Sequence, residues 1–459
     1  MTAAADPTGA IAEFAAGIDF AEAPQRAWQQ AAEAFVDTAG VAIAAHQDQG
    51  FQALLGTMRP ELPAGRSTVL ATGERTSPAM AALLNGGAGH ALDFDDVADQ
   101  IYGHPSTVLV PTVLAVAEAA GAHGKDALAG YLLGFDVCCA VAAAMDVRAH
   151  YTRGWHSTAT IGVLGATAAA ARLLELDAGR IRHALGIAAS MASGSRQNFG
   201  TMTKPLHPGL AARDAVLAAN LAANGFTADP EQLSGPLGYL AMYADGGNPG
   251  AVATALSDPW ALARFGLNVK KYPCCYNMHR TGDAVLDLLR EHPVRPEEIT
   301  EIRLTLEPGG FDPLIHQRPM TGLEGKFSPE YVLAAAVLDG AITLATFQDE
   351  AVQRPAAQQL LRKVSRSTSE VPPIGPSQWE FAYSVVQLHT TDGRTLSHRC
   401  DVPRGDCRAP LSKSDLEAKF RDCVSFGNTG QDADKLLDEL WTLPAAGGGP
   451  LLNLAGPGA

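Results

Sequence analysis

The spacing of apolar residues predicts that the chain from about residue 8 to 265 is mostly helical. Between Ala27 and Ala45, apolar side chains recur every three or four positions, which is the period of one buried helix face. Asp177 stands where a helix N-cap is expected, and Gly225 stands where a helix should end. Similar apolar runs are found at 108–122, 126–145, 158–174, 179–192 and 210–224.

The pattern changes after Asn268. The segment Glu301–Leu306 alternates polar and apolar residues, and Tyr383–Arg399 has the pattern of two strands joined through Asp392-Gly393, a strong hairpin signal. An Ala-rich stretch between them, Tyr331–Ala345, predicts a helix. Helices and strands mixed in this way are typical of an α+β domain.

Two further helical stretches, Leu411–Asp422 and Ala433–Trp441, follow the strands and could rejoin the helical domain. We therefore expect a mainly α protein with an α+β second domain. The expected segments are a helical domain at 1–267, a smaller α+β lid domain at 268–403, and C-terminal helices at 404–459 that return to the helical domain.

Composition and charge narrow the kind of partner. The 459 residues are 47% hydrophobic and 18% charged, and a formal net charge of -15 argues against nucleic acid or an anionic membrane surface. Seven cysteines without CxxC spacing favour reduced thiols in the cytoplasm, and no signal peptide is recognisable. The most apolar windows, at 108–122 and 159–174, are shorter than the roughly 20 residues of a membrane span. A small-molecule ligand is the expected partner.

The densest polar cluster in this apolar chain is GHALDFDDVADQIYGHPS, at 89–106. Neighbouring carboxyls can hold their pKa values apart, and a histidine beside them can act as acid or base near neutral pH. An ordinary turn and a metal loop are the alternatives, but no HxH or HxxxE spacing supports a metal, so we predict none. The cluster contains Asp93, Asp95, Asp96 and Asp99 between His90 and His104.

Three other segments carry candidate groups. In QNFGTMTKPLHPGLAARDA, at 197–215, we expect Lys204 in a loop that prolines keep out of a helix, where it could bind a carboxylate. In VKKYPCCYNMHRTGDA, at 269–284, Lys270 lies at the domain change, and the cysteine pair with His279 offers a nucleophile as an alternative to buried thiols. His156 directly precedes the helix expected to begin near Ser157.

Acids, histidines and lysines from these segments match the needs of proton transfer beside a carboxylate. Cations hold the carboxylates and stabilise a developing enediolate, while a positioned base takes the proton and an acid assists the leaving group. The chain contains neither GxxxxGK[ST] nor a GxGxxG after a strand, so nothing indicates a nucleotide.

At these residues the chain resembles the MmgE/PrpD family, which includes 2-methylcitrate dehydratase, cis-aconitate decarboxylase and iminodisuccinate epimerase. The resemblance covers nearly the whole length and rests on HALDFDD with GHPS, NFGTMTKPLH with AAR, KKYPCC, GLEGKFS, and DVPRGD with LEAKF. It implies a helical domain with a smaller lid domain, a homodimer, and an active site without metal or organic cofactor.

The resemblance also assigns roles to five residues. It implies catalytic roles for Asp93, His104 and Lys204, and substrate binding by His156 and Lys270. His104 with Asp93 would handle the proton, while the other three groups would bind carboxylates and steady the enediolate.

The chain departs from the patterns of two branches of this family. Where the decarboxylase branch carries a threonine, a histidine and a tyrosine, this chain has Val97, Cys275 and Ile315. Methylcitrate dehydratases read Asp-Tyr-Asn-Asp where this chain reads Asp-Phe-Asp-Asp at 93–96. These positions leave the reaction and the substrate open.

Our first hypothesis is a lyase that eliminates water from a citrate-like hydroxy acid, hence a 2-methylcitrate dehydratase-like hydro-lyase. The second is an epimerase or racemase of a dicarboxylate such as iminodisuccinate, and the third a decarboxylase of an aconitate-like acid. A catalytically inactive member that only binds a carboxylate is the alternative outside enzymes, because fold alone does not fix function.

Overall fold

The structure is a computed structural model that describes residues 5–370, 381–447 and 450–454. The chain forms two compact units. The first unit comprises residues 1–91, 95–267 and 413–459, and the second comprises 92–94 and 268–412. Each unit is described below by itself.

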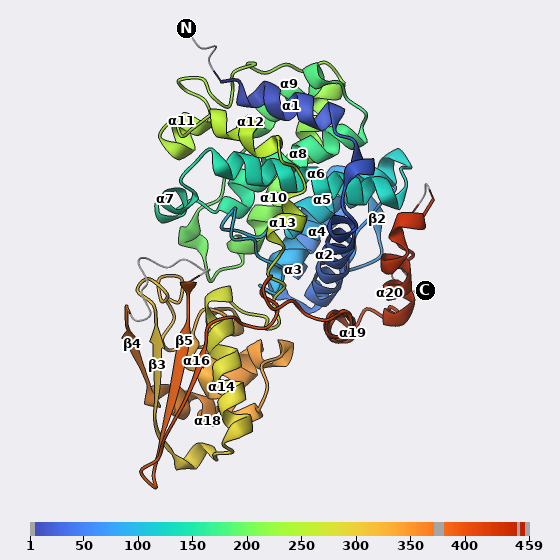
Figure 1. Cartoon of the computed structure of the whole chain (residues 1–459). Helices are drawn as coiled ribbons and strands as arrows, with labels where there is room; N and C mark the ends of the chain where they lie inside the picture. Colours follow the sequence, from blue (N-terminus) through green and yellow to red (C-terminus); the bar gives the residue numbers. More distant parts are fainter. Residues whose placement is uncertain (1–4, 371–380, 448–449, 455–459) are drawn as a thin grey trace. The chain divides into compact units, whose positions relative to one another are not determined.

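The first unit is built almost entirely of helices (Figure 1), and a two-stranded antiparallel sheet of β1 (Ser67–Thr68) and β2 (Arg75–Thr76) is added to them. Its helices are α1 (Pro7–Gly17), α2 (Gln25–Ala44), α3 (Gln49–Met58), α4 (Pro78–Ala91), α5 (Ser106–Ala120), α6 (Gly124–Ala143), α7 (Val147–Thr152), α8 (Ser157–Leu173), α9 (Ala178–Ala189), α10 (Thr203–Ala223), α11 (Tyr239–Ala244), α12 (Gly250–Leu256), α13 (Ala261–Phe265), α19 (Lys413–Gly427) and α20 (Ala433–Trp441).

The apolar periodicity in the sequence located the long helices α2, α5, α6, α8 and α9, because each buries a broad stripe of mostly small side chains. Asp177 caps α9 as expected, accepting a hydrogen bond from the Arg180 amide. The C-terminal helix α19 packs against α2, where Lys419 Nζ lies 2.6 Å from Asp37 Oδ1. The C-terminal helices therefore do return to the helical unit.

Two close helix pairs position the functional segments. A Cβ added at Gly86 of α4 would lie 2.8 Å from the Gly209 Cα of α10, so only glycine allows the two backbones to approach this closely. His90 is in the last turn of α4, and Lys204 and His207 are in the first two turns of α10. The α4–α10 contact therefore brings these three side chains into one region of the first unit.

Helix α6 is 20 residues long and apolar enough to cross a membrane by length and composition. Of its most apolar 18-residue window, however, 89% is buried inside the protein. A long apolar helix that is covered by its neighbours is typical of the core of a large helical domain.

The second unit contains a four-stranded sheet with the order β4-β3-β5-β6. β3 pairs with β4 in parallel, and the β3–β5 and β5–β6 pairs are antiparallel. The hairpin between β5 and β6 turns at Gly393, whose φ of 85° suits glycine. The elements are β3 (Ile299–Leu306), β4 (Val364–Thr368), β5 (Ser384–Thr390), β6 (Thr395–Cys400), α14 (His279–Glu291), α15 (Gly322–Gly325), α16 (Pro329–Asp339), α17 (Asp349–Val352) and α18 (Pro355–Leu360).

The helices α14 and α16 pack together, and α14 packs on β5 and β6, with the helices gathered on one face of the sheet (Figure 1). This arrangement explains the alternation of buried and partly buried residues along β5, since one side of the strand faces the core. The core includes Ile302 and Leu304 of β3 and Val386 and Leu388 of β5.

Two boundaries differ from the sequence predictions. Helix α16 ends at Asp339 rather than near residue 345, because Gly340 adopts a left-handed conformation, with φ of 66°, that ends a helix. Residues 404–412, which we had grouped with the C-terminal helices, belong to the second unit. They are held there by hydrogen bonds from the Val269 amide to the Gly405 carbonyl and from the Cys407 amide to Asn268 Oδ1.

Candidate active site

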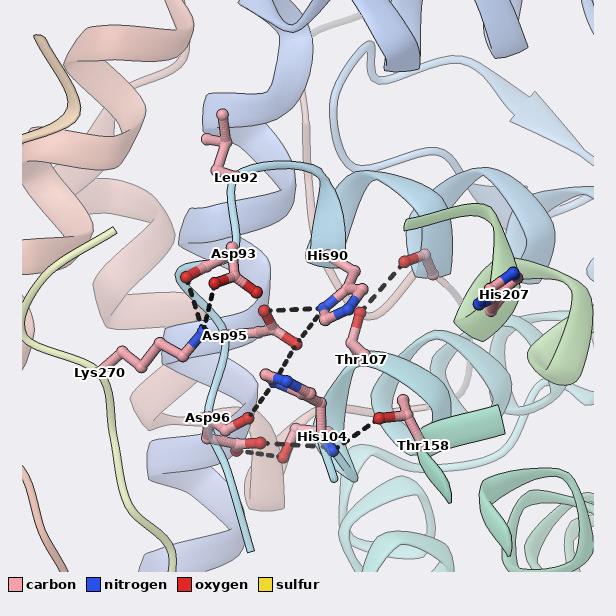
Figure 2. Close-up of polar contacts among 12 residues, drawn as sticks. His90, Leu92, Asp93, Asp95, Asp96, His104, Thr107, Thr158, His207 and Lys270 are labelled. Carbon is pink, nitrogen blue, oxygen red and sulfur yellow. Dashed lines mark hydrogen bonds and ion pairs between the residues drawn. The ribbon is translucent and has the colours of Figure 1, made fainter. Parts of the chain in front are cut away.

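In the first unit, one buried carboxylate faces two imidazole rings (Figure 2). Asp95 Oδ2 lies 2.8 Å from His90 Nδ1 and 3.2 Å from His104 Nδ1. The side chains of His90 and Asp95 are completely buried, whereas that of His104 is 13% exposed. Of the three groups, His104 is therefore the one that a small molecule can reach.

The hydrogen bonds fix which nitrogen of His104 carries a proton. Its Nδ1 lies 2.9 Å from the main-chain carbonyl oxygen of Asp96, and a carbonyl oxygen can only accept a hydrogen bond. Nδ1 must therefore donate, which leaves Nε2 to exchange a proton with a ligand. The main chain is fixed as well, because the His104 amide donates to Thr158 Oγ1 at 3.0 Å.

His90 has the same orientation for a related reason. Both oxygens of Asp95 lie within 3.0 Å of His90 Nδ1, so this nitrogen donates to an ionised carboxylate. His90 Nε2 is buried and has no hydrogen-bond partner among the described residues. His90 thus presents a bare acceptor nitrogen inside the protein.

A second group of side chains adjoins these rings. His156 is the N-cap residue of α8, and its ring stacks on that of His90 with centroids 5.7 Å apart. His156 Nδ1 and His207 Nδ1 lie 3.1 Å apart, so one of the two nitrogens donates to the other. Gly194 makes room for the pair: it has φ of 124°, and a Cβ there would lie 3.3 Å from both side chains.

Lys204 supplies the positive charge of this cluster. Its side chain is 5% exposed, and its Nζ lies 5.2 Å from the centre of the Phe199 ring. Lys204 does not lie in a loop, as the prolines had suggested, but in the first turn of α10. Pro205 occupies the third helical position, where an amide has no helical partner, so it costs the helix nothing there. Pro208 removes one hydrogen bond inside the helix, and α10 continues past it.

Burial and the charge of Lys204 keep His90, His156 and His207 neutral. Burial is the main cause that lowers the pKa of His90 to about 3 and that of His207 to about 4, and Lys204 lowers both further. The pKa of His156 lies well below its usual range for the same two reasons. Burial alone would raise the pKa of Asp95, but His90 and His104 outweigh it and hold that pKa well below the usual range. One carboxylate and one ammonium group thus share an apolar region with neutral imidazoles.

The second unit contains a different arrangement, around the segment 92–94. Lys270 Nζ donates to the carbonyl oxygen of Asp93 at 2.7 Å and lies 3.2 Å from its Oδ2 (Figure 2). Lys326 Nζ donates to the carbonyl oxygens of Leu92 at 2.7 Å and Pro273 at 2.8 Å. Asp93 has φ of 51°, a left-handed conformation that is unfavourable for a residue with a Cβ. The two lysines hold this strained backbone in place.

The hydrogen bonds and burial at the site disfavour both a metal centre and a cysteine nucleophile. Ligand-type atoms of His90, Asp95 and His104 lie within 4.8 Å of one another, so these residues form a candidate metal centre. His104 Nδ1, however, needs its proton for the Asp96 carbonyl and cannot also offer a lone pair to a metal. Cys274 is fully buried, and burial raises the pKa of its thiol far above the usual range, which disfavours a thiolate nucleophile.

The sequence matches two family models over most of its length. Residues 9–251 match the MmgE/PrpD N-terminal domain, and residues 272–443 match the MmgE/PrpD C-terminal domain. The chain belongs to the MmgE/PrpD family. Its helical unit with a smaller α+β unit agrees with the fold expected for a member.

Several curated relatives are cis-aconitate decarboxylases. The human enzyme is 32% identical over 355 residues, which are 76% of this chain and 73% of the relative. A cis-aconitate decarboxylase of Aspergillus terreus is 26% identical over 388 residues, covering 78% of this chain and 77% of the relative. A cis-aconitate decarboxylase-like protein of Aspergillus oryzae is 28% identical, with 79% of each chain covered.

The five residues that the MmgE/PrpD resemblance assigns are divided between the units. His104, His156 and Lys204 gather in the first unit, and Asp93 and Lys270 pair in the second. The contacts of Lys270 favour a role in positioning Asp93 rather than in binding substrate. Four further residues contribute to these arrangements although the family resemblance assigns them no role: His90, Asp95, His207 and Lys326.

Proposed function

We propose that this protein is a lyase that acts on an aconitate-like polycarboxylate. The observation that carries the proposal is the cluster in the first unit, where the buried Lys204 can bind a carboxylate and His104, which is partly exposed, donates from Nδ1 to the main chain, so that Nε2 is its acceptor nitrogen. The names of the relatives support the substrate class, since they act on cis-aconitate. Both pieces of support point to the chemistry of carbon beside a carboxylate group.

Decarboxylation is the first reaction to consider. In an aconitate-like acid, the bond to one carboxylate breaks, and its electron pair forms a new alkene. The electron pair of the original alkene takes up a proton at its far carbon, so the products are carbon dioxide and an unsaturated acid with one carboxylate fewer and its alkene at a new position. His104 would deliver that proton from Nε2, and Asp95 would stabilise the doubly protonated ring before transfer. Lys204 would hold a remaining carboxylate and the charge that develops on it.

Dehydration of a citrate-like hydroxy acid is the second candidate, because position 97 lacks a hydroxyl expected in the decarboxylase branch. The side chain of Val97 is a hydrocarbon, which offers a substrate neither a hydrogen-bond donor nor an acceptor, and it is completely buried. In this reaction His104 would remove the proton beside a carboxylate, the carbon–oxygen bond would break, and the leaving hydroxide would take up a proton, from His104 itself or from solvent, and leave as water. His104 would therefore donate a proton to carbon in the decarboxylation and remove one from carbon in the dehydration.

An assay of the purified chain with cis-aconitate, citrate, methylcitrate and iminodisuccinate tests the proposal. Release of carbon dioxide identifies the decarboxylase, and a new alkene absorbance without carbon dioxide identifies the dehydratase. In deuterated water, label that enters recovered substrate with inversion indicates an epimerase and contradicts both lyase reactions. Lack of turnover with all four acids would favour the inactive, carboxylate-binding alternative.

Variants of the two central residues complete the test. His104→Ala and Lys204→Ala should each lower turnover by roughly 10²-fold or more, the usual contribution of a positioned acid or base, while the circular dichroism spectrum is unchanged. Near-normal activity of both variants would place the chemistry elsewhere. We also propose that the chain forms a homodimer and is located in the cytoplasm. Light scattering tests the homodimer.

A further inference from the structure

Asp96 is fully buried and connects His104 to the interior of the helical unit. Its main-chain carbonyl accepts the hydrogen bond from His104 Nδ1 at 2.9 Å. Its side chain is anchored to the start of α5: a short hydrogen bond joins Oδ2 to Ser106 Oγ, and the Ser106 amide donates to Oδ1 at 3.4 Å. Ser106 Oγ lies in turn 2.7 Å from the hydroxyl of Tyr131 on α6.

We propose that Asp96 is a positioning residue that fixes the tautomer and orientation of His104 through its own carbonyl, while its side chain anchors that carbonyl to Ser106 and Tyr131. The inference rests on the proposed function, in which His104 exchanges a proton through Nε2. Asp96 touches no reacting atom in this scheme. It acts on the reaction only by holding the imidazole that does.

Burial favours the neutral form of the Asp96 carboxyl. Burial raises the pKa of its carboxyl to about 8, and the nearby carboxylates of Asp37 and Asp95 raise it as well, although the hydrogen bond from Ser106 lowers it. A neutral acid, a serine hydroxyl and a tyrosine hydroxyl can form a continuous chain of hydrogen bonds.

The groups around Asp96 come from several elements. They are Asp37 of α2 with its ion-pair partner Lys419 of α19, Asp95 and His104 of the same segment, Ser106 of α5 and Tyr131 of α6. Above a pH of about 8, an ionised Asp96 would add a negative charge beside Asp37 and Asp95. The carbonyl that holds His104 would then be less well fixed, so turnover should fall.

Two substitutions separate anchoring from charge. Asp96→Ala removes the anchor and should lower kcat by roughly tenfold or more with little change in KM, because the substrate-binding groups stay in place. Asp96→Asn has nearly the same shape as the neutral acid, so it should restore most of kcat. It should also remove the loss of activity above about pH 8 that is expected for the wild type. This rescue and the changed pH profile would not follow from a merely structural role.

Asp136→Asn is the matched control. Asp136 is also buried, and burial raises the pKa of its carboxyl to about 6, but it accepts hydrogen bonds from the amides of Trp260 and Ala261 instead. This variant should keep the pH profile of the wild type. Ser106→Ala is the milder second variant if Asp96→Ala does not fold, and it should lower kcat in the same direction.

Nitrogen-15 NMR of the His104 ring gives a readout that does not need turnover. The wild type and Asp96→Asn should show the Nδ1-protonated tautomer, and Asp96→Ala or Ser106→Ala should show a mixture. If Asp96→Ala keeps the wild-type kcat and tautomer, or if Asp96→Asn is as impaired as Asp96→Ala, the inference is wrong. If the wild type turns over no polycarboxylate, the proposed function fails, and the tautomer alone decides the inference.

Discussion

In the first unit, the single carboxylate of Asp95 faces two imidazoles, whereas in the second unit two ammonium groups bind main-chain carbonyls. In the first arrangement the Nδ1 atoms of both rings donate hydrogen bonds, so Nε2 is the acceptor nitrogen of each ring. The second directs donors of Lys270 and Lys326 to the backbone at 92–94. A buried charge can therefore serve proton transfer in one unit and backbone geometry in the other.

The role of a buried lysine can be judged from the groups that surround its ammonium group. Lys204 and Lys270 both lie in short segments that contain a proline, since Lys204 directly precedes Pro205 and Lys270 lies three residues before Pro273. Lys204 lowers the pKa of three histidines, and Lys270 bonds the carbonyl of a strained residue.

The largest effect is expected for Asp95→Ala. This change removes the acceptor of His90 and the ion-pair partner of His104 together, so kcat should fall by about 10²- to 10⁴-fold, the range for loss of general acid–base catalysis. Steady-state kinetics with the identified substrate measures the loss. His150→Gln is the control, because His150 is also buried in the first unit but bonds Tyr243 and Thr160. Comparable losses in both variants would argue that any buried histidine contact matters equally.

The two lysines should separate stability from activity. Lys270→Met leaves the Asp93 carboxylate in the interior without its ion-pair partner and should reduce the free energy of unfolding by about 3–5 kcal/mol. Lys204→Met should abolish turnover with a smaller loss of stability. Urea unfolding and kinetics on both variants measure the two effects. If Lys270→Met is stable but inactive, Lys270 binds substrate, as the sequence first suggested.

The sequence predicted the helical unit because its helices follow one simple rule, a repeated apolar stripe, and their starts and ends carry capping residues such as Asp177. It did not predict β4, since all residues of Val364–Thr368 are only partly buried or exposed and show no alternation. Lys204 was assigned to a loop because a proline was read as a helix breaker, although a proline in the first turn is compatible with a helix.

The candidate site was predictable in part. His104, His156 and Lys204 were found because they lie in motifs that resemble a known family. The role of Asp95 could not be deduced, because four aspartates in one segment look alike until the fold shows which one faces the rings. Likewise, Lys326 acts through main-chain carbonyls, which carry no signal in a sequence.

The buried acid of the first unit should make stability depend on pH. The pKa of Asp96 is raised from 3.8 to about 8, so the folded state binds this proton more tightly than the unfolded state. The contribution of Asp96 to stability is therefore greatest below pH 4 and falls by about 1 kcal/mol per pH unit up to about pH 8. Asp96→Asn does not titrate, so its stability relative to the wild type should rise over this range. Urea unfolding at pH 5, 6.5 and 8 measures the difference, and a constant difference would contradict the raised pKa.

In the second unit, substitutions at Asp93 should have a smaller effect on the backbone. Asparagine tolerates the left-handed conformation at φ of 51° better than alanine, which has no side-chain hydrogen bond to support it. Both substitutions remove the ion pair with Lys270, so the difference between Asp93→Asn and Asp93→Ala isolates the backbone cost. Asp93→Ala should be less stable by about 1 kcal/mol. Equal stabilities by thermal unfolding would show that the left-handed conformation at residue 93 carries no measurable backbone cost.

The smallest effect is expected from a metal chelator. His90, Asp95 and His104 are grouped closely enough to suggest a metal centre. A nitrogen that binds a metal must offer its lone pair, but His104 Nδ1 carries a proton, which it donates to the Asp96 carbonyl. Dialysis against EDTA should therefore leave kcat and the unfolding midpoint unchanged. Added Zn²⁺ serves as the opposite treatment, since a metal that displaces these protons would disrupt the hydrogen bonds and inhibit. If EDTA abolishes activity and Zn²⁺ restores it, the three residues of the first unit are metal ligands, and the proton-transfer role of His104 is wrong.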